Sequence, residues 1–109
     1  QSHVPRFFDG QLPDFNFGTN EGQTVNDQLK AVLENFDTGD YSKIINGRFK
    51  GGFITRQYAK PDDNIFTIQL ELSQITYLDE KLRLLDHDKA KKVRSVIKQL
   101  VLGVASCLE

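Results

Sequence analysis

Residues 65–72 form a mostly apolar run in which every second residue has a large apolar side chain. A carboxylate, that of Glu71, lies near the end of this run. Side chains alternate faces along a β-strand, so this run predicts a strand with one face packed against helices. That apolar face would consist of Phe66, Ile68, Leu70 and Leu72. Gln69 and Glu71 would lie side by side on the opposite face. A carboxylate buried there costs free energy unless a cation, a metal or a substrate offsets the cost.

Glu71 is therefore the candidate for a catalytic general base. Such a group must be held on rigid structure, within reach of the proton that it takes. The alternative is an ion pair between Glu71 and Arg48 or Arg56 that only supports the structure. The sequence pattern is equally compatible with both interpretations.

A second informative segment, residues 46–56, places three cations among three glycines. Glycines let a ligand approach the backbone, and the guanidinium groups of Arg48 and Arg56 match carboxylates bidentately, which Lys50 cannot do. We expect a site for an anionic substrate, with Glu71 placed for proton transfer. The alternative is a twisted hairpin with surface cations. Nucleotide phosphate is disfavoured because the chain has neither a Walker pattern nor the Rossmann glycine fingerprint.

The composition excludes several classes of protein. The chain has 109 residues, enough for one small domain, with 39% hydrophobic and 27% charged residues. Its net charge of −1 argues against nucleic acid and anionic membrane as partners. No apolar run is long enough to span a bilayer. A single cysteine, Cys107, excludes an intramolecular disulfide and favours a reducing cytoplasm.

The remaining periodicity predicts short elements around the strand at residues 65–72. They are an irregular lead at 1–19, a helix at 24–36, strands at 41–46 and 53–58, a turn at 59–64 and a final helix at 88–106. Phenylalanines such as Phe7 and Phe8 would anchor the lead. Thr24 and Asp88 are the predicted helix N-caps. The basic side chains of the final helix predict a solvated face, since no aromatic residues accompany them.

Metal ligands and an activated nucleophile are not evident in the sequence. His3 and His87 are the only histidines, and they lie at opposite ends of the chain without metal-site spacing. There is no Gly-x-Ser-x-Gly motif. The chain thus offers groups that bind a substrate and a base, but nothing that activates the attacking nucleophile.

Several motifs follow one another in an order that is typical of one enzyme family. Residues 4–10 read Val-Pro-Arg-Phe-Phe-Asp-Gly, and residues 12–20 read Leu-Pro-Asp-Phe-Asn-Phe-Gly-Thr-Asn. The glycine-rich segment 46–56 follows, then Gln-Leu-Glu-Leu-Ser-Gln at 69–74 and Thr-Tyr-Leu-Asp-Glu at 76–80. Together these motifs resemble the N-formylglutamate amidohydrolases.

The resemblance implies a zinc-dependent hydrolase with the three-layer α/β/α fold of zinc exopeptidases, a phosphorylase/hydrolase-like arrangement. Such enzymes cleave N-formyl-L-glutamate to formate and L-glutamate in histidine degradation. The resemblance implies that Glu71 acts as general base and that Arg48 and Arg56 clamp the two substrate carboxylates. Asn46 would assist through its amide. The rest of the substrate-binding segment would be Lys50, Gly51 and Gly52.

Two departures from the family pattern limit what this chain does alone. Gln57 stands where the family usually has His, which puts any function of that ring in doubt. The Asp-Ala-His-Ser-like motif that carries metal ligands should lie upstream of Gln1, and it is absent. We therefore expect the C-terminal half of such an enzyme, a piece that binds no zinc and is inactive alone. Such a half would expose apolar surface, so we expect it to dimerise or to associate with the missing N-terminal half.

Three alternative functions remain open from the sequence. A related acylamino-acid hydrolase would share the frame but prefer another acyl group. A non-catalytic module would bind glutamate-like dicarboxylates through Arg48 and Arg56, with Glu71 in a structural role. An interaction domain would use the basic face of the final helix.

Overall fold

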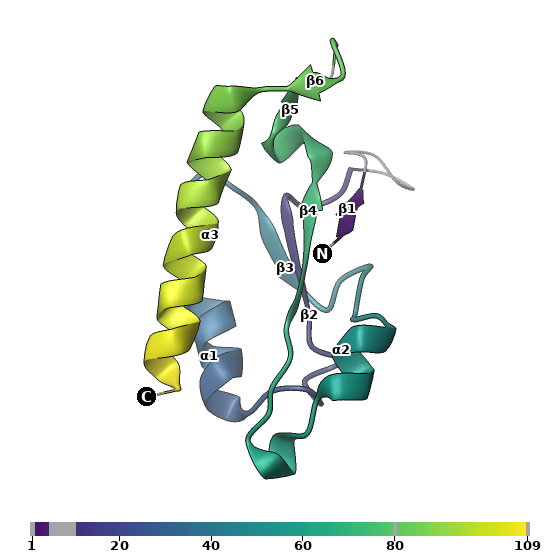
Figure 1. Ribbon diagram of the computed structural model, residues 1–109, viewed down its shortest axis with the longest axis vertical. Helices are drawn as coiled ribbons and strands as arrows, with labels where there is room; N and C mark the ends of the chain where they lie inside the picture. The colour runs from purple at the N-terminus through teal and green to yellow at the C-terminus, as the bar shows by residue number, and fades with distance from the viewer. Residues whose placement is uncertain (1, 5–10, 80, 109) are drawn as a thin grey trace.

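A four-stranded mixed sheet lies at the centre of the computed structural model, which describes residues 2–4, 11–79 and 81–108 (Figure 1). The strands lie in the order β1 (Ser2–Val4), β4 (Gln69–Ser73), β2 (Phe15–Gly18) and β3 (Lys43–Ile45). β4 runs antiparallel to β2, whereas the β1–β4 and β2–β3 pairs are parallel. Together with the helices that pack on it, this sheet confirms the predicted α/β class.

β2 lies inside a segment that the sequence predicted to be irregular. Phe15 and Phe17 are 0% exposed, and Asn16 between them is also buried. The prediction was wrong here because Pro13 precedes the strand and Gly18 is its last residue, so neither interrupts it. The other predicted anchors of the lead, Phe7 and Phe8, lie outside the described residues.

Two helices cover one face of the sheet. These are α1 (Asp27–Asn35) and α3 (His87–Cys107), and Figure 1 shows α1 beside the C-terminal half of α3. Both helices contribute to a single apolar core, because their apolar side chains recur at helical spacing. That core consists of Phe15, Phe17, Leu33, Leu72, Val93 and Leu100.

Both helices begin at caps other than the predicted ones. Asn26 caps α1, since its Oδ1 accepts a hydrogen bond from the Leu29 backbone N–H at 2.9 Å. The predicted cap, Thr24, is buried and donates its hydroxyl to the Thr67 carbonyl at 2.7 Å. Asp86 caps α3 through the Lys89 backbone N–H at 3.0 Å, so Asp88 lies within the first turn.

Residues 53–58 were predicted to be a strand, and they form a helix, α2 (Phe53–Tyr58). Its first backbone bond joins the Arg56 N–H to the Gly52 carbonyl at 3.2 Å. Only Thr55 is buried in this helix, whereas Phe53 and Ile54 are 67% and 72% exposed. The large apolar side chains of this segment are therefore mostly exposed and do not pack as those of a half-buried strand would.

The predicted strand at residues 65–72 is shorter than expected, because its first part lacks a partner. Pairing with β2 begins at Gly18 opposite Gln69, and the chain turns away after Gly18. The 65–68 segment is held instead by a bridge between Ile65 and Lys60 and by the Thr67 N–H bond to the Thr24 carbonyl. Within the paired part the predicted faces are confirmed: Leu72 lies in the core with Leu70 packed against it, and Gln69 contacts Glu71 on the other side.

Short elements complete the fold. The predicted turn contains the 3₁₀ helix η1 (Pro61–Asp63), and a second 3₁₀ helix, η2 (Gln74–Thr76), follows β4. β5 (Leu78–Asp79) and β6 (Leu84–Leu85) form a hairpin before α3. None of the helices in the described part of the chain has both the length and the hydropathy needed to cross a bilayer.

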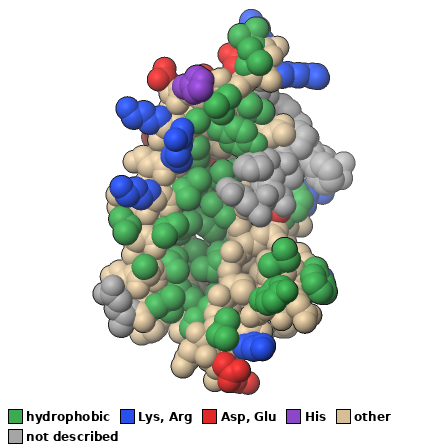
Figure 2. All heavy atoms as spheres, viewed as in Figure 1, with side chains coloured by type: hydrophobic (Ala, Val, Ile, Leu, Met, Phe, Trp, Pro, Cys, Tyr) green, Lys and Arg blue, Asp and Glu red, His purple; other side chains and the backbone are tan. Residues whose placement is uncertain are grey.

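An apolar hollow of about 420 Å³ opens between β4 and the C-terminal half of α3. Figure 2 shows hydrophobic side chains gathered along it. Its floor includes Leu33, Ile68 and Leu70, and its rim includes Val101 and Leu108. The candidate site lies on the other face of the sheet, where the glycine-rich segment crosses β2 and β4.

Candidate functional site

Glu71 is the only carboxylate on the paired part of β4. It is 4% exposed and lies opposite Asn16 of β2, on the sheet face turned away from the core helices. Its Oε1 accepts a hydrogen bond from Gln69 Nε2 at 2.7 Å, and its Oε2 accepts none from the described residues. Within this part of the chain no ion pair joins Glu71 to Arg48 or Arg56, so the arrangement that would make it purely an ion-pair partner is not observed.

Gln69 links Glu71 to Gly52 and to Thr55 at the start of α2. Its Oε1 accepts hydrogen bonds from the Gly52 backbone N–H at 2.7 Å and from Thr55 Oγ1 at 3.1 Å. Thr55 is buried, and its own carbonyl accepts the Thr67 hydroxyl at 2.6 Å. The start of α2 is thereby bound to the same strand that carries Glu71.

The glycine-rich segment is held against β2 by Asn16 and by a close backbone approach. Asn16 Nδ2 donates to the Phe49 carbonyl at 2.6 Å, and its Oδ1 accepts from the Phe49 N–H at 3.3 Å. A Cβ on Gly18 would lie 2.8 Å from the backbone nitrogen of Gly51, so only glycine fits at that crossing. The Asn20 N–H also donates to the Lys50 carbonyl at 2.7 Å.

An open cavity of about 390 Å³ lies between the glycine-rich segment and β4. Its lining consists of Arg48, Phe49, Lys50, Gly51, Gly52, Gln69 and Glu71. The cavity therefore brings together most of the residues that the sequence predicted for the site. Lys50 also forms an ion pair with Glu21. A cavity with cations on one wall and a buried carboxylate on the other suits an anionic substrate that exchanges a proton.

Arg56 does not line this cavity. It lies on α2, and its guanidinium donates from Nη1 to the Gly51 carbonyl at 2.9 Å. This hydrogen bond ties the Arg56 side chain to the backbone of Gly51. Gln57, the neighbouring residue, is exposed on the same helix.

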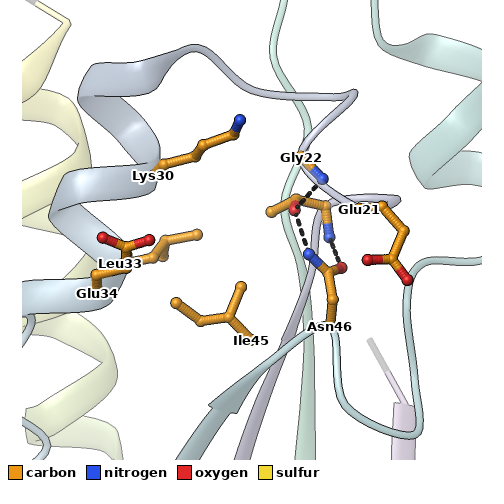
Figure 3. Close-up of a pocket in the computed structure, with 8 residues that line it drawn as sticks. Glu21, Gly22, Lys30, Leu33, Glu34, Ile45 and Asn46 are labelled. Carbon is orange, nitrogen blue, oxygen red and sulfur yellow. Dashed lines mark hydrogen bonds between the residues drawn. The ribbon is translucent and has the colours of Figure 1, made fainter.

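Asn46 lies at a second, smaller cavity of about 220 Å³ on the α1 side (Figure 3). Its Oδ1 accepts from the Thr19 N–H at 2.9 Å, and its Nδ2 donates to Thr19 Oγ1 at 2.8 Å. Asn46 also has a positive φ of 52°, which an asparagine tolerates better than most residues. Its amide is engaged in shaping the turn where the glycine-rich segment leaves β3.

The described residues contain no group of three or more His, Cys, Asp or Glu side chains that could hold a metal ion. His87 is exposed at the start of α3, and Cys107 lies at the end of the same helix. His3 lies in β1, where only the backbone is described. The described residues therefore do not fit the zinc that the family resemblance implies.

Asn16 and Thr55 are site-supporting residues that the sequence did not reveal. Asn16 had one signal, a polar side chain between two phenylalanines in a short alternating pattern. Thr55 had none, since it was assigned to a strand and proved to lie on α2.

Comparison with known proteins supports one family. A model of the N-formylglutamate amidohydrolase family matches residues 1–78. An N-formylglutamate deformylase of Pseudomonas aeruginosa is 47% identical over 104 residues, which cover 93% of this chain and 39% of that protein. A Pseudomonas putida protein of the same name is 43% identical over the same shares. This chain thus spans well under half the length of these curated relatives.

A solved structure shows the same fold. It is the crystal structure of an N-formylglutamate amidohydrolase from Ralstonia eutropha JMP134, with a TM-score of 0.70 and 22% sequence identity. The alignment covers 93% of this chain and 35% of that one. At that identity the likeness concerns the fold alone.

Proposed function

Because the chain belongs to the N-formylglutamate amidohydrolase family, we propose that it forms the substrate-binding and proton-transfer part of an enzyme that hydrolyses N-formyl-L-glutamate. The products are formate and L-glutamate. One observation carries the proposal: Glu71 lines the same cavity as Arg48 and Lys50. A base and the groups for an anionic substrate thus meet in one place.

In this proposal Glu71 takes and returns the proton. As water attacks the formyl carbon, Glu71 accepts a proton from it; as the C–N bond breaks, the proton passes to the amine nitrogen of the departing glutamate. Oε1 is held by Gln69, and Oε2 accepts no bond from the described residues, so we assign the proton transfer to Oε2. Burial of the carboxylate keeps it away from bulk water.

The substrate is a dianion, and the glycine-rich segment is proposed to bind its carboxylates. Arg48 and Lys50 line the cavity, and Gly51 and Gly52 let the ligand approach the backbone. We propose that Arg48 binds one carboxylate directly. For Arg56, which does not line this cavity, we propose a weaker contact with the other carboxylate, through the guanidinium nitrogens that do not bond Gly51. For Asn46 we propose a positioning role, since its amide bonds Thr19.

Zinc and the three-layer α/β/α arrangement belong to the proposal for the complete enzyme. The described residues offer no zinc ligand set, so their proposed part is limited to the substrate and the proton. We propose that the metal ligands lie elsewhere in the complete enzyme and that this chain alone neither binds zinc nor turns over substrate. The Ralstonia structure, with its TM-score of 0.70, supports the fold.

A chimera tests the proposal directly. This chain would replace the matching segment of the Pseudomonas aeruginosa relative, and formate release from N-formyl-L-glutamate would be measured with zinc supplied. We expect turnover in the chimera and its loss in the Glu71→Gln variant, by roughly 10²–10⁴-fold. A chimera that folds and binds N-formyl-L-glutamate but gives equal rates with and without Glu71→Gln would contradict the role of Glu71. A folded chimera that hydrolyses only other acylamino acids would point instead to a related hydrolase.

A further inference from the structure

We propose that Gln69 is a positioning residue that fixes the carboxylate of Glu71 and couples it to the glycine-rich segment. The inference rests on the proposed role of Glu71 as the proton-transferring group. It concerns a side chain with no assigned part in the reaction, which stands two residues before Glu71 on the same face of β4.

Both the nitrogen and the oxygen of the Gln69 side-chain amide form hydrogen bonds. Nε2 donates to Glu71 Oε1 at 2.7 Å, while Oε1 accepts from the Gly52 N–H at 2.7 Å and from Thr55 Oγ1 at 3.1 Å. A backbone N–H can only donate, and the oxygens of an ionised carboxylate can only accept. Turning the amide over would therefore place a donor against the Gly52 N–H and an oxygen against the carboxylate. The network allows one orientation, with the N–H toward Glu71.

This orientation distinguishes the two oxygens of Glu71. Oε1 is occupied by Gln69, whereas Oε2 is buried and accepts no hydrogen bond from the described residues. A buried acceptor left without a donor is uncommon in proteins and suits an atom that meets a ligand. Gln69 thereby leaves Oε2 as the oxygen that exchanges the proton in the proposed reaction. It also restricts the torsion angles of the Glu71 side chain.

The same amide transmits the position of the glycine-rich segment to Glu71. Gly52 lies within that segment, immediately before α2, and Thr55 lies on α2. A shift of Gly52 would move Gln69 Oε1 and, through the planar amide, the donor that holds Glu71. The base and the substrate-binding wall are thus kept in one mutual position, which a reaction requires to within a fraction of an ångström.

The test is a double-mutant cycle in the chimera described above. Gln69→Leu keeps the bulk of the side chain and removes its hydrogen bonds, and it should lower kcat about 10- to 100-fold with KM within about twofold. In the Glu71→Gln background, assayed over long incubations, Gln69→Leu should have no further effect, because Gln69 acts through Glu71. Gln28→Leu, on the exposed face of α1, is the matched control and should leave kcat unchanged.

Three results would overturn the inference. An unchanged kcat in Gln69→Leu, or an equal loss of rate in both backgrounds, would mean that Gln69 supports the fold only. A rise in KM alone would assign it to substrate binding instead. If Gln69→Leu does not fold by circular dichroism, Thr55→Val removes one donor to Gln69 and should give a smaller fall in kcat that is absent from the Glu71→Gln background.

The proposed function and this inference fail in different ways. A folded chimera without activity toward N-formyl-L-glutamate contradicts the proposed function. In that protein, slow solvent exchange of the Gln69 side-chain N–H protons, measured by NMR and lost in Glu71→Leu, would still support the positioning contact. Fast exchange in both proteins would contradict it. An active chimera in which Gln69→Leu behaves like Gln28→Leu leaves the proposed function intact and rejects the inference.

Discussion

Asn16 and Phe49, 33 positions apart, are joined by both polar atoms of one side-chain amide. The Asn16 Nδ2 donates to the Phe49 carbonyl at 2.6 Å, and its Oδ1 accepts from the Phe49 N–H at 3.3 Å. The side-chain amide of Asn16 thus forms with Phe49 the pair of hydrogen bonds that a neighbouring strand would form. Since Asn16 lies opposite Glu71 in the β2–β4 pair, the same contact places the glycine-rich segment over the candidate base.

Replacing Asn16 by leucine should destabilise the protein and loosen the site. The substitution leaves the N–H and carbonyl of Phe49 without the Asn16 amide, at a cost of about 1–3 kcal/mol in the free energy of unfolding. Urea denaturation of the two proteins measures the difference. Asn35→Leu is the control, since Asn35 is exposed and its amide donates to the Ala31 carbonyl of its own helix. Equal losses in both variants would mean that the Phe49 contact has no special role.

Gly18→Ala should displace the glycine-rich segment. The added Cβ would lie 2.8 Å from Gly51 N and 2.9 Å from the Lys50 carbonyl carbon, and both are backbone atoms that cannot rotate away. We expect a loss of about 1–3 kcal/mol in the free energy of unfolding. In Gly103→Ala a Cβ meets nothing within 4 Å, so this helical position should instead gain about 0.5–1 kcal/mol. Gly18→Ala with unchanged stability would show that the segment moves freely.

The relation between Gln69 and Glu71 was predictable because it depends on one strand alone. Residues two apart on a strand share a face whatever the strand pairs with, so the alternation at residues 65–72 sufficed. Helices α1 and α3 were predictable for a similar reason, since their apolar stripes are local. Their first residues were not, because Thr24 and Asn26 both have the chemistry of a cap and only the path of the chain chooses between them.

The supporting contacts of the site were not predictable, because they join distant segments. Nothing near Asn16 indicates that its amide meets Phe49, and nothing near Gly52 indicates that its N–H meets Gln69. Residues 53–58 were predicted to be a strand and form α2, where Phe53, Ile54 and Tyr58 lie. These side chains are mostly exposed, so their preference for a pleated surface had no surface to act on.

The two arginines should differ in their effect on substrate binding. Arg48 lines the cavity with Glu71, whereas Arg56 lies on α2 and donates to the Gly51 carbonyl. In the chimera, Arg48→Met should raise KM for N-formyl-L-glutamate about 10- to 100-fold, since a charge-assisted hydrogen bond contributes about 1.5–3 kcal/mol. Arg56→Met should raise it about tenfold or less.

Arg94→Met on the exposed face of α3 serves as the control for loss of a cation. Its KM should equal that of the unaltered chimera, because Arg94 does not line the cavity. If Arg48→Met and Arg94→Met gave the same KM, Arg48 would have no direct part in binding. A larger effect for Arg56→Met than for Arg48→Met would reverse the proposed assignment.

Lys43 should be a major contributor to the stability of α1. Its ammonium donates to the carbonyls of Leu33, Glu34 and Phe36 at 2.8, 2.8 and 2.6 Å, where the helix leaves carbonyl groups without partners. Lys43→Met keeps most of the side-chain length and removes these three hydrogen bonds. We therefore expect a loss of about 1–3 kcal/mol in the free energy of unfolding. Lys98→Met, on the exposed side of α3, should change it by less than about 0.5 kcal/mol. Similar values for both variants would contradict the capping role.

Tyr41 should make the stability of the protein fall at alkaline pH. Burial raises the pKa of Tyr41, the charge of Lys92 opposes that rise, and Asp14 and Asp40 add to it. The folded protein therefore keeps the phenolic proton of Tyr41 at pH values where the unfolded chain, whose tyrosines have a pKa of about 10, has lost it. The stabilisation is complete below the unfolded pKa and is lost as the pH rises through the folded pKa.

Tyr41→Phe should accordingly make the free energy of unfolding less dependent on pH above about 10, as measured by urea denaturation at a series of pH values. The phenylalanine keeps the ring contact with Phe15, whose centroid lies 5.3 Å away, so stability at neutral pH should change little. Tyr58→Phe removes a hydroxyl from an exposed ring and is the control. A Tyr41→Phe protein that loses stability with rising pH as steeply as the unaltered chain would show that another group causes the alkaline transition. Burial also raises the pKa of Tyr77, so Tyr77 would be the next position to replace.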